Sequence, residues 1–386
     1  MDYSLYLHIP FCVHRCAYCD FNTYAGQESL IPEYVDALVR EIAIVADSAP
    51  ERLTAHTVFF GGGTPSLLSS LQLSAIMDAL RSAFTFTPDL EASLEANPGT
   101  VSLDSLHGLR RAGFNRLSFG VQSAHPDELR QLERIHDFFE VIQSVKWARQ
   151  AGFDNLNLDL IYGLPEQTLA RWQESLRHVL DLGPEHLSLY ALTLEHGTPF
   201  GRWAARGLMP LPDPDLAADM YEWASETLEG IGYEQYEISN WAKPGRQCRH
   251  NLQYWRGRPY LGLGAGAHGF ASQTRVANVL RIKTYIERCT DATPQPFPVS
   301  PATVNRQEII AFVEMQETMM TGLRLTQEGV PEQRFRERFG KEMRDVFGKE
   351  IDELVRLELL EQAEGTVRLT RRGRLLGNQV FMRFVG

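Results

Sequence analysis

Residues 8–19 of the chain read HIPFCVHRCAYC and place three cysteines, Cys12, Cys16 and Cys19, at C-x3-C-x2-C spacing. Three thiolates can hold three irons of a cubane cluster and leave the fourth iron open, whereas four-cysteine ferredoxin sites close that position. A structural zinc site is the alternative, and it needs a fourth ligand such as His8 or His14. The spacing and the position just after a first apolar strand favour a [4Fe–4S] cluster, whose open iron can chelate S-adenosylmethionine.

The rest of the composition indicates a globular protein whose cysteines are reduced thiols. Two further cysteines, Cys248 and Cys289, stand alone, so the five cysteines of the 386 residues do not describe a disulfide framework. The chain starts Met1-Asp2-Tyr3-Ser4 without the features of a secretion signal, and no window approaches the length of a membrane span. A cytoplasmic protein is expected. The net charge of -11 argues against a general binder of nucleic acid.

Apolar and β-branched runs alternate with amphipathic stretches along the first 230 residues. Strand, helix and strand repeated six times predict an α/β fold of parallel strands with right-handed crossovers. The periodicity does not separate an open sheet from a barrel, but in both cases ligands gather at the carboxyl ends of the strands. The expected strands are Leu5–Ile9, His56–Phe60, Glu91–Glu95, Arg116–Gly120, Asn155–Ile161 and His186–Thr193.

Polar residues lie at the ends of several of these strands. The run Gly61-Gly62-Gly63-Thr64-Pro65 follows the second strand, and its glycines allow the backbone to approach a ligand closely, with N–H groups that can bind a carboxylate. Glu95, Gln122 and Asp159 end or occupy the next three strands. Polar groups are costly to bury without partners, so several at successive strand ends predict one shared ligand.

The C-terminal part shows a different pattern. Tyr233–Trp241 is expected to form another strand, and a proline-rich stretch at 293–298 is expected to be a linker. Beyond it, helices are expected at 305–321, 331–338 and 342–357, and a hairpin of 366–370 with 379–385, which together make a winged-helix-like domain. Residues 300–386 hold 14 Lys plus Arg and 14 Asp plus Glu, so the electrostatic footprint of DNA binding is missing.

The phrases HIPFC, GGGTPS, LDLIYGLP and LGLGAGAHGF resemble the radical S-adenosylmethionine (SAM) superfamily, in the branch that contains oxygen-independent coproporphyrinogen III oxidase and the heme chaperone HemW. The resemblance implies a partial (β/α)6 barrel over 1–230, a barrel extension over 231–292 and a winged-helix-like domain over 299–386. It also implies a [4Fe–4S] cluster on the three cysteines and bound SAM. The residues implied to contact that SAM are Tyr6, Gly63, Thr64 and Glu95, and those matching a second SAM site of the oxidase are Gln122, Arg134 and Asp159.

Three features separate the two relatives and favour the chaperone. The oxidase pattern continues Cys-x-Cys after the third cysteine, whereas this chain has Asp20-Phe21, and the long arm that precedes the first strand of the oxidase is missing. The third feature is the HNxxYW motif at 250–255, where His250 is a candidate axial ligand for heme iron. Cys248 is a rival ligand. His268 is expected either to face the substrate cavity or to cap its glycine-rich turn.

The leading hypothesis is therefore a heme chaperone that keeps its cluster and SAM. The alternative is an oxidase that decarboxylates the propionates of coproporphyrinogen, which would make the chain an oxidoreductase. A third hypothesis is a radical enzyme with an unrelated substrate. The partners that the resemblance implies are heme, acceptor hemoproteins such as respiratory enzymes, an electron donor for the cluster and a peripheral contact with a membrane, without nucleic acid.

Overall fold

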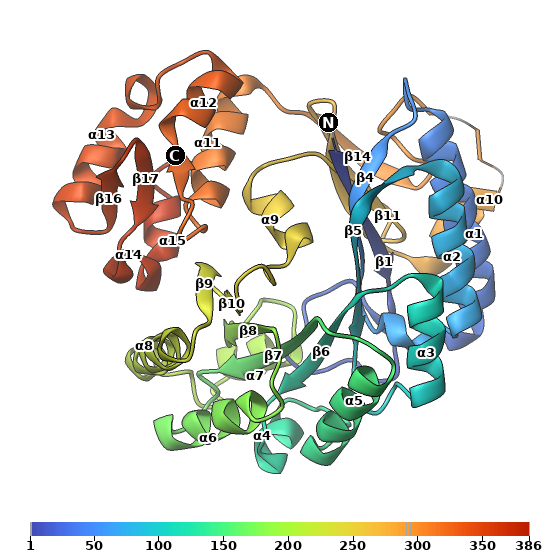
Figure 1. The fold of residues 1–386 in the computed structure, drawn as a ribbon, viewed down its shortest axis with the longest axis horizontal. Helices are drawn as coiled ribbons and strands as arrows, with labels where there is room; N and C mark the ends of the chain where they lie inside the picture. Colours follow the sequence, from blue (N-terminus) through green and yellow to red (C-terminus); the bar gives the residue numbers. More distant parts are fainter. Residues whose placement is uncertain (1, 291, 294, 386) are drawn as a thin grey trace. The chain divides into compact units, whose positions relative to one another are not determined.

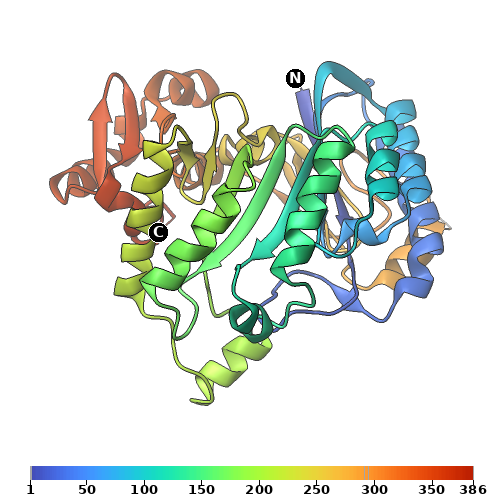
Figure 2. The same ribbon diagram turned by 60° about the horizontal axis from the view of Figure 1, so that its bottom comes forward.

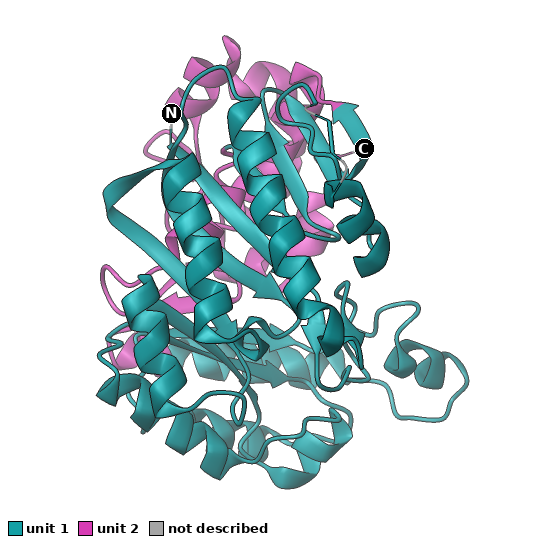
Figure 3. Ribbon diagram, turned by 90° about the vertical axis from the view of Figure 1, so that its right-hand side faces the viewer, with its two compact units in different colours: residues 1–226, 259–307 teal, residues 227–258, 308–386 magenta. Residues whose placement is uncertain are grey.

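The computed structural model describes residues 2–290, 292–293 and 295–385, and the chain divides into two compact units (Figure 3). Unit 1 contains residues 1–226 and 259–307, and unit 2 contains residues 227–258 and 308–386. The expected middle segment, 231–292, is thus divided at residue 258, because the strand that begins at Tyr260 pairs in register with the first strand of the chain. Residues 291 and 294 of the expected extension and linker lie outside the described residues.

The six expected parallel strands are all present in unit 1, and they lie side by side in the order in which they occur in the chain (Figures 1 and 2). Each pairs in parallel with the next. This confirms the predicted α/β class and the partial barrel. The strands are β1 (Asp2–Ile9), β4 (Thr54–Gly62), β5 (Thr85–Ala96), β6 (Arg116–Gln122), β7 (Leu156–Tyr162) and β8 (His186–Ala191).

Four more strands extend the sheet beyond β1. β11 (Tyr260–Leu263) runs parallel to β1, β12 (His268–Ala271) pairs antiparallel with β11, and β13 (Thr274–Asn278) pairs antiparallel with β12, followed by β14 (Thr303–Glu308). The last of these overlaps the helix that the sequence predicts at 305–321, so that helix begins later than expected. A separate pair, β2 (Phe11–Cys12) and β3 (Tyr24–Ala25), closes the cysteine loop.

Most helices of unit 1 follow their strands and cover the outer face of the sheet (Figures 1 and 2). Local sequence starts several of them, because Ser69 with Gln72, Ser102 with Ser105 and Asp137 with Glu140 form reciprocal capping boxes. The helices are α1 (Ile31–Asp47), α2 (Ser70–Ala83), α3 (Leu103–Ala112), α4 (Pro126–Gln131), α5 (Phe138–Gln150), α6 (Leu169–Leu180), α7 (Pro199–Ala205), α10 (Ile282–Thr290) and the short 3₁₀ turns η1 (Glu28–Leu30) and η2 (Pro65–Leu67), with α8 (Pro214–Gly230) running from unit 1 into unit 2.

Unit 2 has its own apolar core, formed by its helices and a small antiparallel sheet in the order β15-β17-β16. Residues 379–385 do not form the expected strand. The wing instead pairs 360–363 with 366–369 across a turn at Glu364 and Gly365, both of which have positive φ. The expected strand Tyr233–Trp241 is a hairpin of two short strands. The elements are β9 (Glu234–Glu237), β10 (Asn240–Ala242), α9 (Arg249–Trp255), α11 (Ala311–Gly322), β15 (Val330–Pro331), α12 (Glu332–Phe339), α13 (Met343–Arg356), β16 (Leu360–Ala363), β17 (Thr366–Leu369), α14 (Arg371–Leu375) and α15 (Gly377–Phe381).

In the described part of the chain, every helix is too short or too polar to cross a lipid bilayer.

Candidate iron–sulfur and S-adenosylmethionine site

The cysteine loop leaves the carboxyl end of β1 and is closed at its base by the β2–β3 pair. Cys12 lies on β2 and is buried, whereas Cys16 and Cys19 lie on the loop itself and are partly exposed. A tight turn joins the last two cysteines, since the N–H of Cys19 donates to the Cys16 carbonyl over 3.1 Å. The local sequence therefore brings all three thiols to one end of the parallel sheet, where α/β folds bind their ligands.

Each of the three sulfurs lies next to a polar side chain that can donate a hydrogen bond to it. Thr64 Oγ1 lies 3.7 Å from Cys12 Sγ, Arg134 Nη1 lies 3.7 Å from Cys16 Sγ, and Thr23 Oγ1 lies 4.0 Å from Cys19 Sγ. Burial raises the pKa of the Cys12 and Cys19 thiols, and the neighbouring cysteines raise the pKa further. Bound cations would relieve this repulsion between thiolates, because metal ions favour the deprotonated ligand.

This donor set fits a cluster better than a zinc ion. In a cubane each cysteine binds a different iron, so the three sulfurs need not converge on one point. Among the described residues, no three His, Cys, Asp or Glu side chains are grouped around a single metal position. Both candidate fourth ligands are also engaged elsewhere, because His8 Nε2 bonds to the Asn22 carbonyl at 2.9 Å and His14 Nε2 to Glu133 Oε2 at 3.1 Å.

The glycine turn after β4 packs directly against the cysteine loop. The N–H of Gly63 donates to the Ile9 carbonyl and the N–H of Thr64 to the Phe11 carbonyl, both over 2.8 Å. A Cβ on Gly63 would overlap the Phe11 carbonyl, so this position requires glycine. These N–H groups have acceptors within the protein and are therefore not available to the carboxylate of a ligand, contrary to the expectation from the sequence. The turn instead holds the start of the cysteine loop in place through these two hydrogen bonds.

A chain of hydrogen bonds links the sulfurs of two of the three cysteines through residues from three loops. Arg134 Nη2 donates to Asn97 Oδ1 over 2.5 Å and to the Gly120 carbonyl over 2.8 Å, while Asn97 Nδ2 donates to Thr64 Oγ1 over 2.9 Å. Thr64 in turn contacts Cys12, and Arg134 contacts Cys16. Cys16, Thr64, Asn97 and Arg134 all line one small pocket that is partly open to solvent. Sequence reasoning missed Asn97, although it follows Glu95 by two residues at the same strand end.

Two partly buried carboxylates form the second part of the site. Burial, together with the nearby charge of Asp159, raises the pKa of Glu95 to about 7, although Glu95 Oε2 accepts a hydrogen bond from the Gly62 N–H over 3.1 Å. Burial also raises the pKa of Asp159, whose oxygens accept from Asn157 Nδ2 and Ser118 Oγ. A pair of acidic groups in a region of low dielectric attracts a cationic ligand such as a sulfonium or an ammonium group.

Tyr6 and Gln122 complete the set of predicted residues in unit 1. The Tyr6 hydroxyl bonds to His8 Nδ1 over 3.0 Å, and burial followed by the charge of Glu95 raises the pKa of Tyr6. Gln122 ends β6 with a φ of 68°, a left-handed conformation that is uncommon for a residue with a side chain. A Cβ built on Gly120 would lie 2.8 Å from Gln122 Nε2 and 2.9 Å from Arg134 Nη2, so these two side chains converge there. The structure thus brings all the predicted residues of unit 1 to one end of the sheet.

His250 belongs to unit 2, where it lies on α9. Its imidazole is 1% exposed, and its Nε2 bonds to the Tyr254 hydroxyl one helical turn further on, over 2.8 Å. Cys248, the rival heme ligand, is the N-cap residue of the same helix and is fully buried. His268 is exposed at the start of β12.

A three-cysteine loop at the end of the first strand of a parallel sheet, with a glycine turn after the next strand, defines a radical SAM protein. The model of the radical SAM superfamily matches residues 6–179, and the model of the HemN C-terminal domain matches residues 313–376. The heme chaperone HemW of Bacillus subtilis (strain 168) is 41% identical over 99% of both chains, and that of Escherichia coli (strain K12) is 37% identical over 99% of this chain and 98% of that one.

Among solved structures, coproporphyrinogen III oxidase (HemN) from Escherichia coli, described as a radical SAM enzyme, matches with a TM-score of 0.83 and 27% identity. The match covers 99% of this chain and 90% of the oxidase chain. The chain belongs to the HemW family of the radical SAM superfamily.

Proposed function

We propose that this protein is a heme chaperone, which binds heme and transfers it to acceptor hemoproteins. The observation that carries the proposal is the full-length match to proteins named heme chaperone HemW, at identities well above that to the oxidase structure. The residue pair Asp20-Phe21 supports it, because the oxidase pattern has a further cysteine where this chain has the exposed Phe21.

The cofactors of the proposal are a [4Fe–4S] cluster on Cys12, Cys16 and Cys19 and a SAM molecule beside it. When bound, the two together supply one-electron reductive cleavage of a carbon–sulfur bond. Of the protein groups, Thr64 and Arg134 donate hydrogen bonds to the sulfurs of Cys12 and Cys16, and Glu95 and Asp159 supply negative charge for the cationic groups of SAM.

The SAM contacts proposed for this chain are Tyr6, Gly63, Thr64 and Glu95. A second SAM molecule at Gln122, Arg134 and Asp159 would compete with existing contacts, because the Arg134 guanidinium is held by Asn97 and the Gly120 carbonyl and lies against Cys16. We therefore propose that the main role of Arg134 is to hold the cysteine loop through Cys16, and not to bind a second SAM.

The proposed heme ligand is His250, and its environment indicates what heme binding requires. Its Nε2 bonds to Tyr254, and the imidazole is packed at 87° against the tyrosine ring. Iron coordination through Nε2 therefore displaces the Tyr254 hydroxyl and opens this part of α9. Trp255 of the same motif stacks under Arg324, whose guanidinium carbon lies 4.4 Å from the ring centroid.

An anaerobic titration of the cluster-reconstituted protein with hemin tests this proposal. The wild-type protein should bind hemin stoichiometrically, and His250→Ala should weaken binding at least about tenfold, because an axial bond to iron is lost. Tyr254→Phe should bind as tightly as wild type or more tightly, since the hydrogen bond between Tyr254 and Nε2 no longer has to be broken. His196→Ala, an exposed histidine, is the matched control.

The outcomes separate the parts of the proposal. A wild-type protein that shows no hemin spectrum refutes the chaperone function. Unchanged binding by His250→Ala refutes only the ligand assignment. Transfer is measured by mixing the heme-loaded protein with an apo-hemoprotein and following the shift of the heme absorption.

The second candidate is an oxygen-independent coproporphyrinogen III oxidase, which the TM-score of 0.83 to that enzyme favours. Anaerobic incubation with coproporphyrinogen III, a reductant and SAM decides between the two. Formation of protoporphyrinogen IX would replace the first function with the second, and 5′-deoxyadenosine formed without heme binding or porphyrin conversion would indicate an unrelated substrate.

The proposal also includes the partners of the protein and its location in the cell. An electron donor reduces the cluster, acceptor hemoproteins such as respiratory enzymes receive the heme, and the chaperone works in the cytoplasm with a peripheral contact to the membrane where those acceptors lie. Heme transfer to membrane vesicles that contain an apo-hemoprotein, compared with empty vesicles, tests this extension.

A further inference from the structure

The glycine-rich segment between β11 and β12, Gly264-Ala265-Gly266-Ala267, has no part in the function proposed above, yet it packs against the cysteine loop. A Cβ on Gly266 would overlap the side-chain amide of Asn22. A Cβ on Gly264 would lie 2.5 Å from the His8 carbonyl oxygen, and both glycines have positive φ. The backbone of this segment therefore approaches the chain on either side of the three cysteines as closely as glycine allows.

Asn22, three residues after Cys19, joins the loop to this segment. Its Nδ2 donates to the Ala265 carbonyl over 3.1 Å and to the Leu280 carbonyl over 3.0 Å. Its own main-chain carbonyl accepts a hydrogen bond from His8 Nε2 over 2.9 Å. Because a carbonyl oxygen only accepts, His8 carries its proton on Nε2, and its Nδ1 accepts from the Tyr6 hydroxyl. Asn22 is thus held from both sides.

The segment is itself anchored by a buried carboxylate on α1. Glu41 is fully buried and accepts hydrogen bonds from the Gly264 N–H over 2.7 Å, the Tyr285 hydroxyl over 2.6 Å and Asn278 Nδ2 over 2.8 Å. A buried polar network with every member satisfied is rigid, since breaking one bond leaves a group unpaired in a region of low dielectric.

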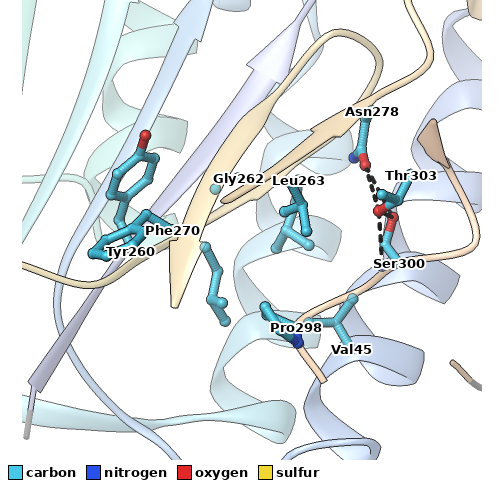
Figure 4. A pocket seen from close by; sticks show the side chains of 12 residues that line it. Val45, Tyr260, Gly262, Leu263, Phe270, Asn278, Pro298, Ser300 and Thr303 are labelled. Carbon is cyan, nitrogen blue, oxygen red and sulfur yellow. Dashed lines mark hydrogen bonds between the residues drawn. The ribbon is translucent and has the colours of Figure 1, made fainter. Parts of the chain in front are cut away.

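The amide of Asn278 is oriented from its other side. Ser300 Oγ and Thr303 Oγ1 lie 3.1 and 3.2 Å from Asn278 Oδ1, and Figure 4 shows the three side chains pointing toward one another. These two donors leave only the Nδ2 end to face Glu41 and the Gly264 carbonyl. The Asn278 side chain can therefore bind Glu41 in only one orientation of its amide group.

We propose that Asn22, held by the glycine-rich segment, is a positioning residue that fixes the Cys19 side of the cysteine loop. Cys12 is placed by the β2–β3 pair and Thr64, and Cys16 by Arg134. The main chain at Cys19 also makes the turn hydrogen bond to the Cys16 carbonyl, and its own carbonyl accepts from the exposed side chain of Arg15 over 3.4 Å. The inference rests on the proposed function only in that the loop binds a cluster, and it is independent of heme.

Substitutions in the full-length chain test the proposal. Asn22→Ala removes both side-chain hydrogen bonds, and Asn22→Asp removes the donors while keeping the shape. Gly266→Ala displaces an unchanged Asn22. Gly26→Ala is the matched control, because Gly26 also has a positive φ (71° against 81°) but nothing lies within 4 Å of its added Cβ.

The first readout uses the protein without cluster and measures the rate at which iodoacetamide modifies each cysteine, by peptide mass spectrometry. We expect the rate at Cys19 to rise roughly tenfold in Asn22→Ala and Gly266→Ala, because two hydrogen bonds that oppose local opening are lost. Cys12 should change less than about twofold, as should every cysteine in Gly26→Ala. In the double variant Asn22→Ala/Gly266→Ala the effects should not add.

The second readout uses anaerobically reconstituted protein and compares iron content and the electron paramagnetic resonance spectrum of the reduced cluster. A changed spectrum in Asn22→Asp at unchanged thermal stability supports the positioning role. Equal effects of Gly266→Ala and Gly26→Ala, or a Cys19 rate and spectrum unchanged in Asn22→Ala, overturn it. Wild-type protein that takes up no iron refutes the cluster and this role together, whereas failure to bind heme affects only the chaperone proposal.

Discussion

The raised pKa of Glu95 predicts that SAM binds more tightly as the pH rises from 6 to 8. With a pKa of about 7 in the unliganded protein, the carboxylate is roughly 10% ionised at pH 6 and roughly 90% ionised at pH 8. SAM carries its positive charge on the sulfonium and amino groups, so it prefers the ionised form. If only that form binds, the dissociation constant falls about tenfold over this range.

The same shift has a consequence for folding stability. The pKa of Glu95 is raised above the value of 4.5 expected for an exposed side chain, so between these two values the folded protein binds more protons than the unfolded chain. Stability of the unliganded protein is therefore lost as the pH rises through this window, by roughly 3 kcal/mol at most. Bound SAM should recover part of this loss, because a cationic partner favours the ionised carboxylate.

Anaerobic calorimetry on the reconstituted protein measures the effect. Titrations at pH 6, 7 and 8, in buffers that differ in ionisation enthalpy, give both the affinity and the number of protons released. Glu95→Gln should bind SAM weakly and with little dependence on pH, because the amide does not titrate. The reasoning is refuted if the affinity of wild type falls with rising pH, or if wild type and Glu95→Gln share one pH profile.

Three further predictions follow from contacts in unit 1. Replacing Arg134 by Met removes a partly buried positive charge and a hydrogen bond to Cys16 Sγ, and should lower the reduction potential of the cluster. A redox titration of Arg134→Met and Arg134→Lys measures the shift, in which 59 mV corresponds to a tenfold fall in the ratio of reduced to oxidised protein. Glu41→Ala leaves three buried donors without their acceptor and should lower the free energy of unfolding by about 3 kcal/mol or more in chemical denaturation, with Asp47→Ala at the end of the same helix as control. Alanine at any one of the three loop cysteines should abolish stable iron and sulfide binding, whereas Cys248→Ala should retain both, and equal iron content in all four variants would contradict the assignment.

Much of the fold could be predicted because its signals are local. The spacing of the apolar runs predicted six strands, and the structure confirms all six, with ends that differ by up to six residues. Capping residues such as Ser69 and Asp137 start the helices between them. The errors occurred where pairing, and not propensity, decides the conformation. Residues 379–385 have the composition of a strand, but β17 already pairs on both sides, so that this segment forms α15 and the residues after it.

The site residues on the cysteine loop, the glycine turn and the acidic strand ends could also be predicted from the sequence, since each lies in a short run of distinctive residues. Arg134 was expected at a second SAM site, and only the structure shows its guanidinium against Cys16, which lies 118 residues away in the chain. Asn97 had no signal apart from its place near Glu95. Its role depends on Arg134 and Thr64, which meet it from two other loops.

The sequence by itself determined the chemistry of this protein, because spacing within a dozen residues decides whether thiols can share a cluster and whether a run of residues is a strand or a helix. The tertiary structure decided which distant groups surround that chemistry: Asn22 meets the carbonyl of a residue 243 positions later, and Glu41 meets Tyr285 across 244. Such contacts follow from the register of neighbouring strands and from how the ends of the sheet come together. These are properties of the whole packed core, and no short segment encodes them.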